Sequence, residues 1–176
     1  MGCLKSIEND ELINEDFDNK KINEFNATAL NSHNKYREMH NVEDLVLKKS
    51  LCQKARKKVL KLLKYKGDLN NYDNIDDSDD DIEYGQNLCI CNGKLFDIEE
   101  ICNNWYDEGN KYVYDSNKYI KGTGHFTQMI WKDTKTVGFG YSKIHKDKSI
   151  FLVYYYPAGN EQGKFKENIQ KKTKNL

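Results

Sequence analysis

Two strand-like runs in the C-terminal half of the chain place the strongest constraint on its fold. They are TVGFGYSKI (residues 136–144) and SIFLVYYYPAG (149–159), and the short polar segment HKDK between them predicts a β-hairpin. Because side chains alternate between the two faces of a strand, Gly138 and Gly140 leave one face of the first run bare while apolar residues fill the other. A bare glycine face lets another backbone or a helix approach closely. The sequence therefore predicts a sheet with a second layer packed tightly on this face.

Three segments before the hairpin show helical periodicity. The first stripe is Ile22, Phe25, Ala29, His33, Tyr36 and His40, and the second, within residues 50–66, is Cys52, Ala55, Val59, Leu62 and Leu63. The third helix begins with a capping-box pair, Asp97 and Glu100. A further strand is expected at NLCIC, residues 87–91. Helices that precede and alternate with strands favour an α+β fold with helices packed on a central sheet.

Glu108 continues the apolar stripe of the third helix, which is formed by Ile98, Ile101 and Trp105. A carboxylate on a buried face costs several kcal/mol unless it is paired. Glu108 therefore either has a partner or turns outward at the end of the helix.

The length of 176 residues fits one domain, which we divide into a flexible N-terminal tether (1–20), a folded domain (21–170) and a basic C-terminal tail (171–176). The formal net charge is zero, so the overall charge gives no support to nucleic-acid binding. Five cysteines, with no apolar signal segment and no transmembrane run, favour an intracellular chain with reduced thiols.

Three of the cysteines lie in predicted secondary structure in the second half of the chain. Cys89 and Cys91 are expected on the same side of one strand, and Cys102 lies on the third helix. Buried free cysteines behave as small hydrophobic residues. We predict that all three pack in the core, in preference to metal or redox chemistry for the strand pair or a nucleophilic role for Cys102.

The N-terminal sequence MGCLKS fits the myristoylation pattern, with Gly2 as the acceptor once Met1 is removed. A single myristoyl chain binds membranes only marginally, with an affinity of roughly 10⁴ M⁻¹, so a second signal is needed. The acidic segment that follows would be repelled by an anionic leaflet, which favours palmitoylation of Cys3 over a basic patch. The alternative is a chance match to the pattern. We predict an acylated tether.

The segment YDNIDDSDDDIE, residues 72–83, is acidic and of low complexity. An EF-hand calcium loop does not fit, because the required glycine at the sixth loop position is missing. Ser78 precedes three aspartates, as in sites for acidophilic kinases. A solvated surface insertion is the preferred interpretation.

Six segments of the chain resemble the CAP superfamily of cysteine-rich secretory, antigen five and pathogenesis-related proteins. The segments are ALNSHNKYREMHNVEDLVL (29–47), GQNL (85–88), WYDE (105–108), GHFTQMIWKDTKTVGFGYSK (124–143), FLVYYYPAGN (151–160) and GNEQGKFKENI (159–169). The N-terminus and the cysteine usage resemble the Golgi-associated plant pathogenesis-related branch. The resemblance implies a three-layer α-β-α sandwich with a mainly antiparallel central sheet.

The resemblance also implies a tetrad of two histidines and two glutamates in a surface cleft, which holds zinc or another divalent ion in several relatives. His125 and Glu108 match two of its positions. At the third position this chain has Gln86, and at the fourth it has Asn70 or Asn71, of which we take Asn71. We expect His125 to face Glu108. Because zinc sites hold at least three His, Cys or carboxylate ligands, no metal or other cofactor is expected beyond a weakly bound divalent ion, which His125 and Glu108 would hold.

Three functions remain open at this point. The first is a membrane-anchored module that binds lipids such as sterols or fatty acids, attached to the cytoplasmic face of the Golgi, another endomembrane or the plasma membrane. The second is a metal-assisted hydrolase that uses Glu108 as a base and His125 as a ligand or an acid. The third is a non-catalytic structural partner in a membrane-associated assembly. We favour the first and expect no enzymatic activity, while homodimers are a further expectation from the resemblance.

Overall fold

The computed structural model describes residues 19–64, 82–92, 97–145 and 148–173. Its elements in chain order are α1 (Asn19–Met39), β1 (Val46–Leu47), α2 (Lys49–Lys64), β2 (Gly85–Asn92), α3 (Ile98–Asp107), the 3₁₀ helix η3 (Glu108–Lys111), α4 (Gly124–Met129), β3 (Thr136–His145), β4 (Lys148–Tyr156) and α5 (Phe165–Asn168). The predicted tether up to residue 18, most of the acidic segment with Ser78, and the last three residues lie outside the described residues.

Among the described residues, the sheet has four strands in the order β1-β3-β4-β2. The predicted hairpin is confirmed: β3 and β4 pair antiparallel, with Gly138 opposite Tyr154. Strand β2 adds antiparallel to the other side of β4, whereas β1 pairs in parallel with β3 through two residues. The central sheet is therefore mainly antiparallel, as expected.

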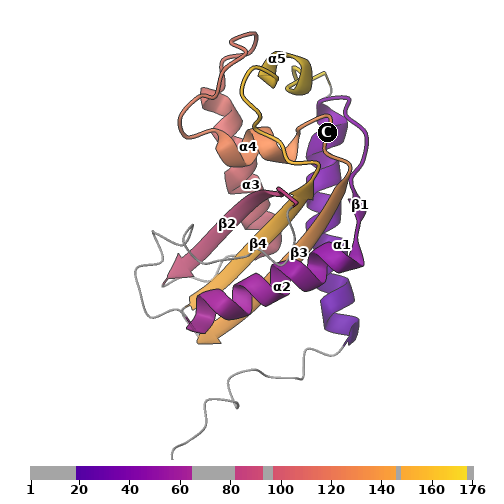
Figure 1. Ribbon diagram of the computed structural model, residues 1–176, viewed down its shortest axis with the longest axis vertical. Coiled ribbons are helices and arrows are strands. Elements are labelled where there is room, and N and C mark those ends of the chain that lie inside the picture. The colour runs from indigo at the N-terminus through magenta and orange to yellow at the C-terminus, as the bar shows by residue number, and fades with distance from the viewer. Residues whose placement is uncertain (1–18, 65–81, 93–96, 146–147, 174–176) are drawn as a thin grey trace, which may run out of the picture.

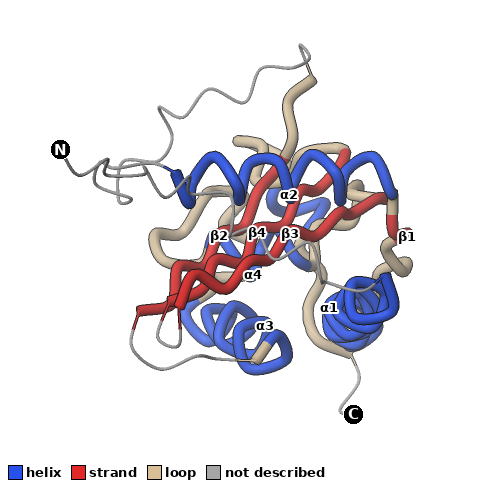
Figure 2. The backbone as a smooth tube through the Cα atoms, turned by 90° about the horizontal axis from the view of Figure 1, so that it is seen from below, coloured by secondary structure: helices blue, strands red, loops and turns tan. Residues whose placement is uncertain are grey.

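Helices cover both faces of this sheet (Figures 1 and 2). Helix α2 lies alone across one face, while α1 and α3 lie against the other. The bare glycine face of β3 meets α2: a Cβ atom built on Gly138 would lie 2.3 Å from the carbonyl carbon of Leu51, and one on Gly140 would lie 2.5 Å from that of Ala55. The predicted close approach is confirmed, and the approaching layer is a helix.

Two hydrophobic cores follow from this three-layer arrangement. The smaller core lies between α2 and the sheet and includes Ala55, Val59 and Leu62 together with Leu152. The larger core joins α1, α3 and α4 to the opposite face. Cys102 is fully buried in the larger core, which confirms its predicted packing role. No helix of the described residues combines the length and apolar character needed to cross a membrane.

Arg37 is a fully buried residue of α1 that the predicted stripe did not include. Its guanidinium donates to four backbone carbonyls: Nε to Glu43 at 2.7 Å, Nη1 to Met129 at 3.1 Å and Trp131 at 2.8 Å, and Nη2 to Thr134 at 3.0 Å. Three of these carbonyls belong to the end of α4 and the turn that leads to β3. Arg37 therefore fixes α4 against α1.

Candidate functional site: the Glu108–His125 pair

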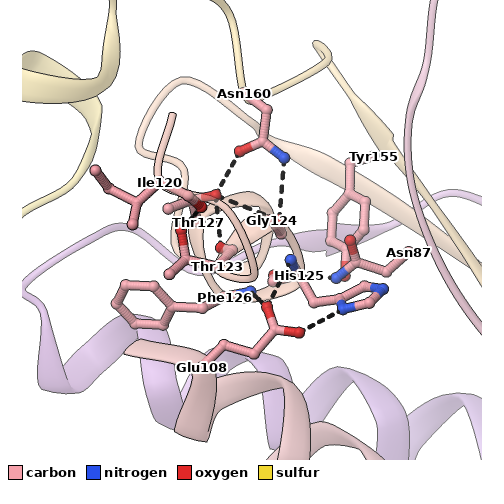
Figure 3. A network of polar contacts seen from close by, with 10 residues as sticks. All are labelled: Asn87, Glu108, Ile120, Thr123, Gly124, His125, Phe126, Thr127, Tyr155 and Asn160. Atoms are coloured by element: carbon pink, nitrogen blue, oxygen red, sulfur yellow. Dashed lines mark hydrogen bonds and ion pairs between the residues drawn. The ribbon is translucent and has the colours of Figure 1, made fainter. Parts of the chain in front are cut away.

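Glu108 and His125 come from two short helices that pack against each other (Figure 3). The distance between His125 Nδ1 and Glu108 Oε1 is 2.7 Å, so the imidazole donates its Nδ1 proton to the carboxylate. The Glu108 side chain is 22% exposed and that of His125 is 37% exposed. The expected contact is present, and the alternative in which Glu108 turns outward without a partner is wrong.

Glu108 also supplies the N-terminal cap of α4. The residue at the N-cap position, Thr123, makes no side-chain capping bond. Instead, Glu108 Oε2 accepts from the backbone N–H groups of His125 at 3.0 Å and Phe126 at 3.3 Å. These are the second and third residues of α4, whose N–H groups lack partners within the helix and are the ones an N-cap side chain serves. Glu108 thus starts α4 and orients the histidine on it.

One face of the His125 imidazole packs against an aromatic ring. The ring of Trp105, one turn before Glu108, lies parallel to that of His125 with 5.2 Å between the ring centroids. The same indole stacks on Phe151 of β4 at 5.3 Å, which connects His125 to the larger core. Among the described residues no hydrogen bond reaches His125 Nε2, so this nitrogen is the part of the pair open to a ligand.

We expect Glu108→Ala to destabilise the protein more than His125→Ala. The glutamate change removes the cap and the imidazole acceptor together, and loss of an N-cap costs about 1–2 kcal/mol. The histidine change leaves both backbone bonds to Glu108 in place, so it should cost about 1 kcal/mol or less. Urea denaturation of both variants, with Glu108→Gln as the conservative control, measures the order. An equal or reversed order would show that Glu108 does not cap α4 in solution.

A buried polar chain supports the site from behind. Asn87 of β2 donates through Nδ2 to the backbone carbonyl of His125 at 3.1 Å and to the Tyr155 hydroxyl at 3.1 Å. The Tyr155 hydroxyl lies 2.7 Å from His33 Nε2, and His33 Nδ1 lies 2.7 Å from the carbonyl of Ala29. A carbonyl can only accept, so Nδ1 carries the proton and Nε2 accepts from Tyr155. The chain of bonds therefore links α1, the sheet and the first turn of α4.

Burial keeps His33 neutral in this chain. It lowers the pKa of His33 from 6.5 to about 4, and the positive charge of Arg37 contributes in the same direction, while the bond to Ala29 opposes it. Burial raises the pKa of Tyr155 well above its usual value of 10.0, so this hydroxyl keeps its proton and can donate to His33. Burial likewise lowers the pKa of His40.

These pKa shifts predict that stability falls with acid. Between about pH 6.5 and about pH 4 the unfolded chain protonates His33 while the folded chain does not, so unfolding takes up a proton. The free energy of unfolding should fall by roughly 3 kcal/mol over this window and level off below it, with His40 adding in the same direction. Urea titrations across the window should give a flatter profile for His33→Gln than for the wild type. Identical slopes would contradict a neutral buried His33.

Asn160 anchors α4 from the loop that follows β4. Its Oδ1 accepts from the Thr127 hydroxyl at 2.6 Å, and its Nδ2 donates to the Gly124 carbonyl at 3.0 Å (Figure 3). Sequence reasoning missed Asn87, Tyr155 and Asn160 as supports of the site. The only sequence signal for them is that each lies within a segment that resembles the CAP superfamily.

Gln86, the third predicted site residue, does not join the pair. The sheet register pairs Gln86 with Tyr154, which belongs to the core under α2, whereas its neighbour Asn87 points to His125. Because adjacent strand residues point to opposite faces, Gln86 leaves the sheet on the α2 side. No hydrogen bond links Gln86 to Glu108 or His125 within the described part of the chain. Asn70, Asn71, Gly2 and Cys3 lie outside the described residues.

The donors that the described residues place at this site do not fit a zinc ion. Zinc sites use at least three neutral His, thiolate or carboxylate ligands. Glu108 already accepts three N–H donors through its two oxygens, so among the described residues His125 Nε2 is the ligand atom of the pair that makes no hydrogen bond. Across residues 19–64, 82–92, 97–145 and 148–173, no group of three or more His, Cys, Asp or Glu side chains is arranged to hold a metal. The geometry instead provides an oriented imidazole beside an aromatic ring.

Comparisons with known proteins agree with the fold and the sequence segments. Residues 30–156 match the family model CAP, the cysteine-rich secretory protein family. Golgi-associated plant pathogenesis-related protein 1 of Homo sapiens is 32% identical over 157 residues, which cover 83% of this chain and 92% of that protein. Protein PRY2 of Saccharomyces cerevisiae is 32% identical over 87 residues, which cover 49% of this chain and 25% of PRY2.

Solved structures show the same architecture. Schistosoma mansoni venom allergen-like protein 4 superposes with a TM-score of 0.58 at 25% identity, covering 77% of this chain and 89% of that one. The structure of NaASP2 with Zn²⁺ gives a TM-score of 0.56 at 19% identity, covering 82% of this chain and 84% of that one, and supports the fold alone. The three-layer sandwich, the family match and the near full-length relative agree, and the chain belongs to the CAP, or cysteine-rich secretory protein, family.

Proposed function

We propose that this protein is a membrane-anchored CAP domain that binds lipids, including sterols or fatty acids, and serves as an interaction module. The observation that carries the proposal is the likeness to the Golgi-associated plant pathogenesis-related protein over 92% of that protein's length. The name of that relative supports an endomembrane location. We place this protein on the cytoplasmic face of the Golgi, another endomembrane or the plasma membrane.

The N-terminal acylation pattern supports the anchoring part of the proposal. Gly2 would carry myristate and Cys3 palmitate. The two chains together would hold the protein on the membrane, because one myristoyl chain alone exchanges rapidly. The tether would then leave the folded domain free to meet lipids or proteins at the membrane surface.

We expect Gly2→Ala to move the protein from the membrane fraction to the soluble fraction of its own cells, because the myristoylation pattern requires glycine at this position. Cys3→Ser should release only part of the protein, since myristate remains. Fractionation followed by immunoblotting measures both. Retention of the Gly2→Ala variant on carbonate-washed membranes would contradict the anchor.

Lipid binding by the domain itself needs a separate test, on unacylated protein. Flotation with vesicles that contain sterol or fatty acid, against vesicles of phosphatidylcholine alone, is expected to show selective binding to the first two. Unacylated protein that stays unbound in all vesicles, while the acylated protein is membrane-bound in cells, would favour the structural-partner alternative.

The Glu108–His125 pair keeps a hydrolase as the second candidate. A carboxylate that orients an imidazole, with Nε2 bonded to none of the described residues, is the arrangement of a general base. Against this, no hydroxyl or thiol of the described residues bonds to Nε2, and the donors within that part of the chain do not fit zinc. We therefore propose a non-enzymatic protein. An ester-hydrolysis screen with and without divalent ions, comparing wild type with His125→Ala, tests it: activity lost in the variant would establish the enzyme.

A further inference from the structure

Cys89 and Cys91 point to the same side of β2, and their Sγ atoms lie 3.4 Å apart in hydrogen-bond contact. Cys91 is 4% exposed, whereas Cys89 is partly exposed. In the sheet register Cys89 lies opposite Phe151 and Cys91 opposite Ser149, so both thiols lie on the face that carries the larger core. This pair of thiols is not used by the site described above.

We propose that Cys89 and Cys91 form a reversible intramolecular disulfide by exchange with a small-molecule disulfide such as glutathione disulfide. This proposal does not depend on lipid binding, so it would still hold if the protein bound no lipid. The sequence pattern alone favoured two packed hydrophobic residues, and the sulfur contact is the observation that adds a chemical role.

The exchange follows the different exposures of the two thiols. The Cys89 thiolate attacks one sulfur of glutathione disulfide, the disulfide bond of the reagent breaks, and one glutathione thiolate leaves. Cys91, held next to the mixed disulfide and in no need of solvent access, then loses its proton and attacks the Cys89 sulfur. The second glutathione thiolate leaves, the two glutathiones take up the two protons, and the protein has transferred two electrons to the reagent.

The positions of Cys89 and Cys91 on β2 allow a disulfide to form between them, but with strain. Residues two apart on a strand have Cα atoms about 6.4–6.8 Å apart, at the upper end of the range of about 4.4–6.8 Å found in disulfides. Strand β2 must therefore shorten locally to close the bond. In the sheet of the described residues β2 is an edge strand beside β4, so it has one neighbouring strand to adjust rather than two. Strain of this kind makes a disulfide easier to reduce.

The environment makes the reaction slow at neutral pH. Burial raises the pKa of the Cys89 thiol to about 12, and the contact with Cys91 adds to the shift. Because the thiolate is the attacking species, the first step should be run at mildly alkaline pH, with incubation over hours. Exposed, lower-pKa redox cysteines react faster, so this pair would respond to sustained rather than brief oxidation.

The experiment treats the folded full-length protein carrying Cys3→Ser with glutathione disulfide and follows its intact mass. We expect a loss of two hydrogens, mapped by digestion to the peptide that contains both cysteines and reversed by dithiothreitol. Cys91→Ser should instead accumulate a stable adduct of one glutathione on Cys89, and Cys89→Ser should show neither product. Cys52, which is partly exposed on α2 and has no thiol in hydrogen-bond contact within the described part of the chain, serves as the matched single-cysteine control.

Two outcomes would overturn the proposal. One is a glutathione adduct that persists on Cys89 in the protein that retains Cys91. This result would show that the Cys91 thiol cannot reach the mixed disulfide on Cys89. The other is a pair that stays fully reduced in the folded protein while Cys52, or the urea-unfolded protein, is modified. Circular dichroism of each variant before treatment verifies that the fold is retained.

Discussion

Gly138→Val is expected to lower the free energy of unfolding by about 3 kcal/mol, the upper end of the usual overpacking range, or more. The first atom of the new side chain would lie 2.3 Å from the carbonyl carbon and Cβ of Leu51 and 2.4 Å from the backbone nitrogen of Cys52. These are mostly main-chain atoms of α2, which cannot turn away as a flexible side chain could. The helix must move off the sheet, and the smaller core would lose contacts along its length.

Thr136→Val is the matched control for this change. It lies on the same strand and the same face two residues earlier, and it exchanges a hydroxyl for a methyl group without added length. Thermal and urea denaturation of both variants should give a shift of several degrees for Gly138→Val and little change for Thr136→Val. Equal shifts would mean that α2 does not rest on the glycine face.

The hairpin and its helix-covered face could be predicted because their signals are local. Alternation along β3 assigns Gly138 and Gly140 to one face whatever the rest of the chain does, and a face without Cβ atoms is bare in any fold. The identity of the covering element required the structure. The parallel pairing of the two-residue strand β1 with β3 was missed because so short a run carries no periodicity.

The resemblance to the CAP superfamily predicted part of the candidate site. His125 and Glu108 meet as the matched segments implied. The capping of α4 by Glu108 was not predicted, since it depends on the placement of η3 against a helix that follows in the chain. Gln86 was assigned to the pair by motif alone. Gln86 and Asn87 are adjacent on β2, so their side chains lie on opposite faces of the sheet. Which of the two faces the site follows from the pairing of β2 with β4, and the motif does not contain that information.

Buried polar residues were the least predictable part of the molecule. The helical stripe of α1 included His33 but gave no indication that it would lie fully buried between Ala29 and Tyr155. Arg37 was absent from the stripe, because arginine is usually exposed. Arg37 can be buried because backbone carbonyls of residues 129–134 accept its hydrogen bonds. These residues are far away in the chain, so the sequence around Arg37 does not predict them.

We expect Arg37→Met to lower the free energy of unfolding by about 4 kcal/mol or more, since stranding a buried hydrogen-bonding group costs about 1–3 kcal/mol and this guanidinium serves four carbonyls. Burial lowers the pKa of Arg37 to about 10, so it remains charged at neutral pH. The desolvation of that charge offsets part of the gain from its bonds in the wild type. Methionine fills similar space but donates to none of the carbonyls. The variant therefore bears the full cost of leaving the four buried carbonyls without a donor.

Arg37→Lys separates the charge from the geometry of the donors. One ammonium group keeps the charge but cannot match a planar fork that reaches carbonyls on several sides, so the lysine variant should lie between the wild type and Arg37→Met. Arg56→Met, on the exposed side of α2, controls for the loss of an arginine at the surface and should change stability by less than about 0.5 kcal/mol. Urea denaturation at neutral pH ranks the four proteins. If Arg37→Met proved as stable as Arg56→Met, α4 and its following turn would have to be held by Glu108 and Asn160 without the guanidinium.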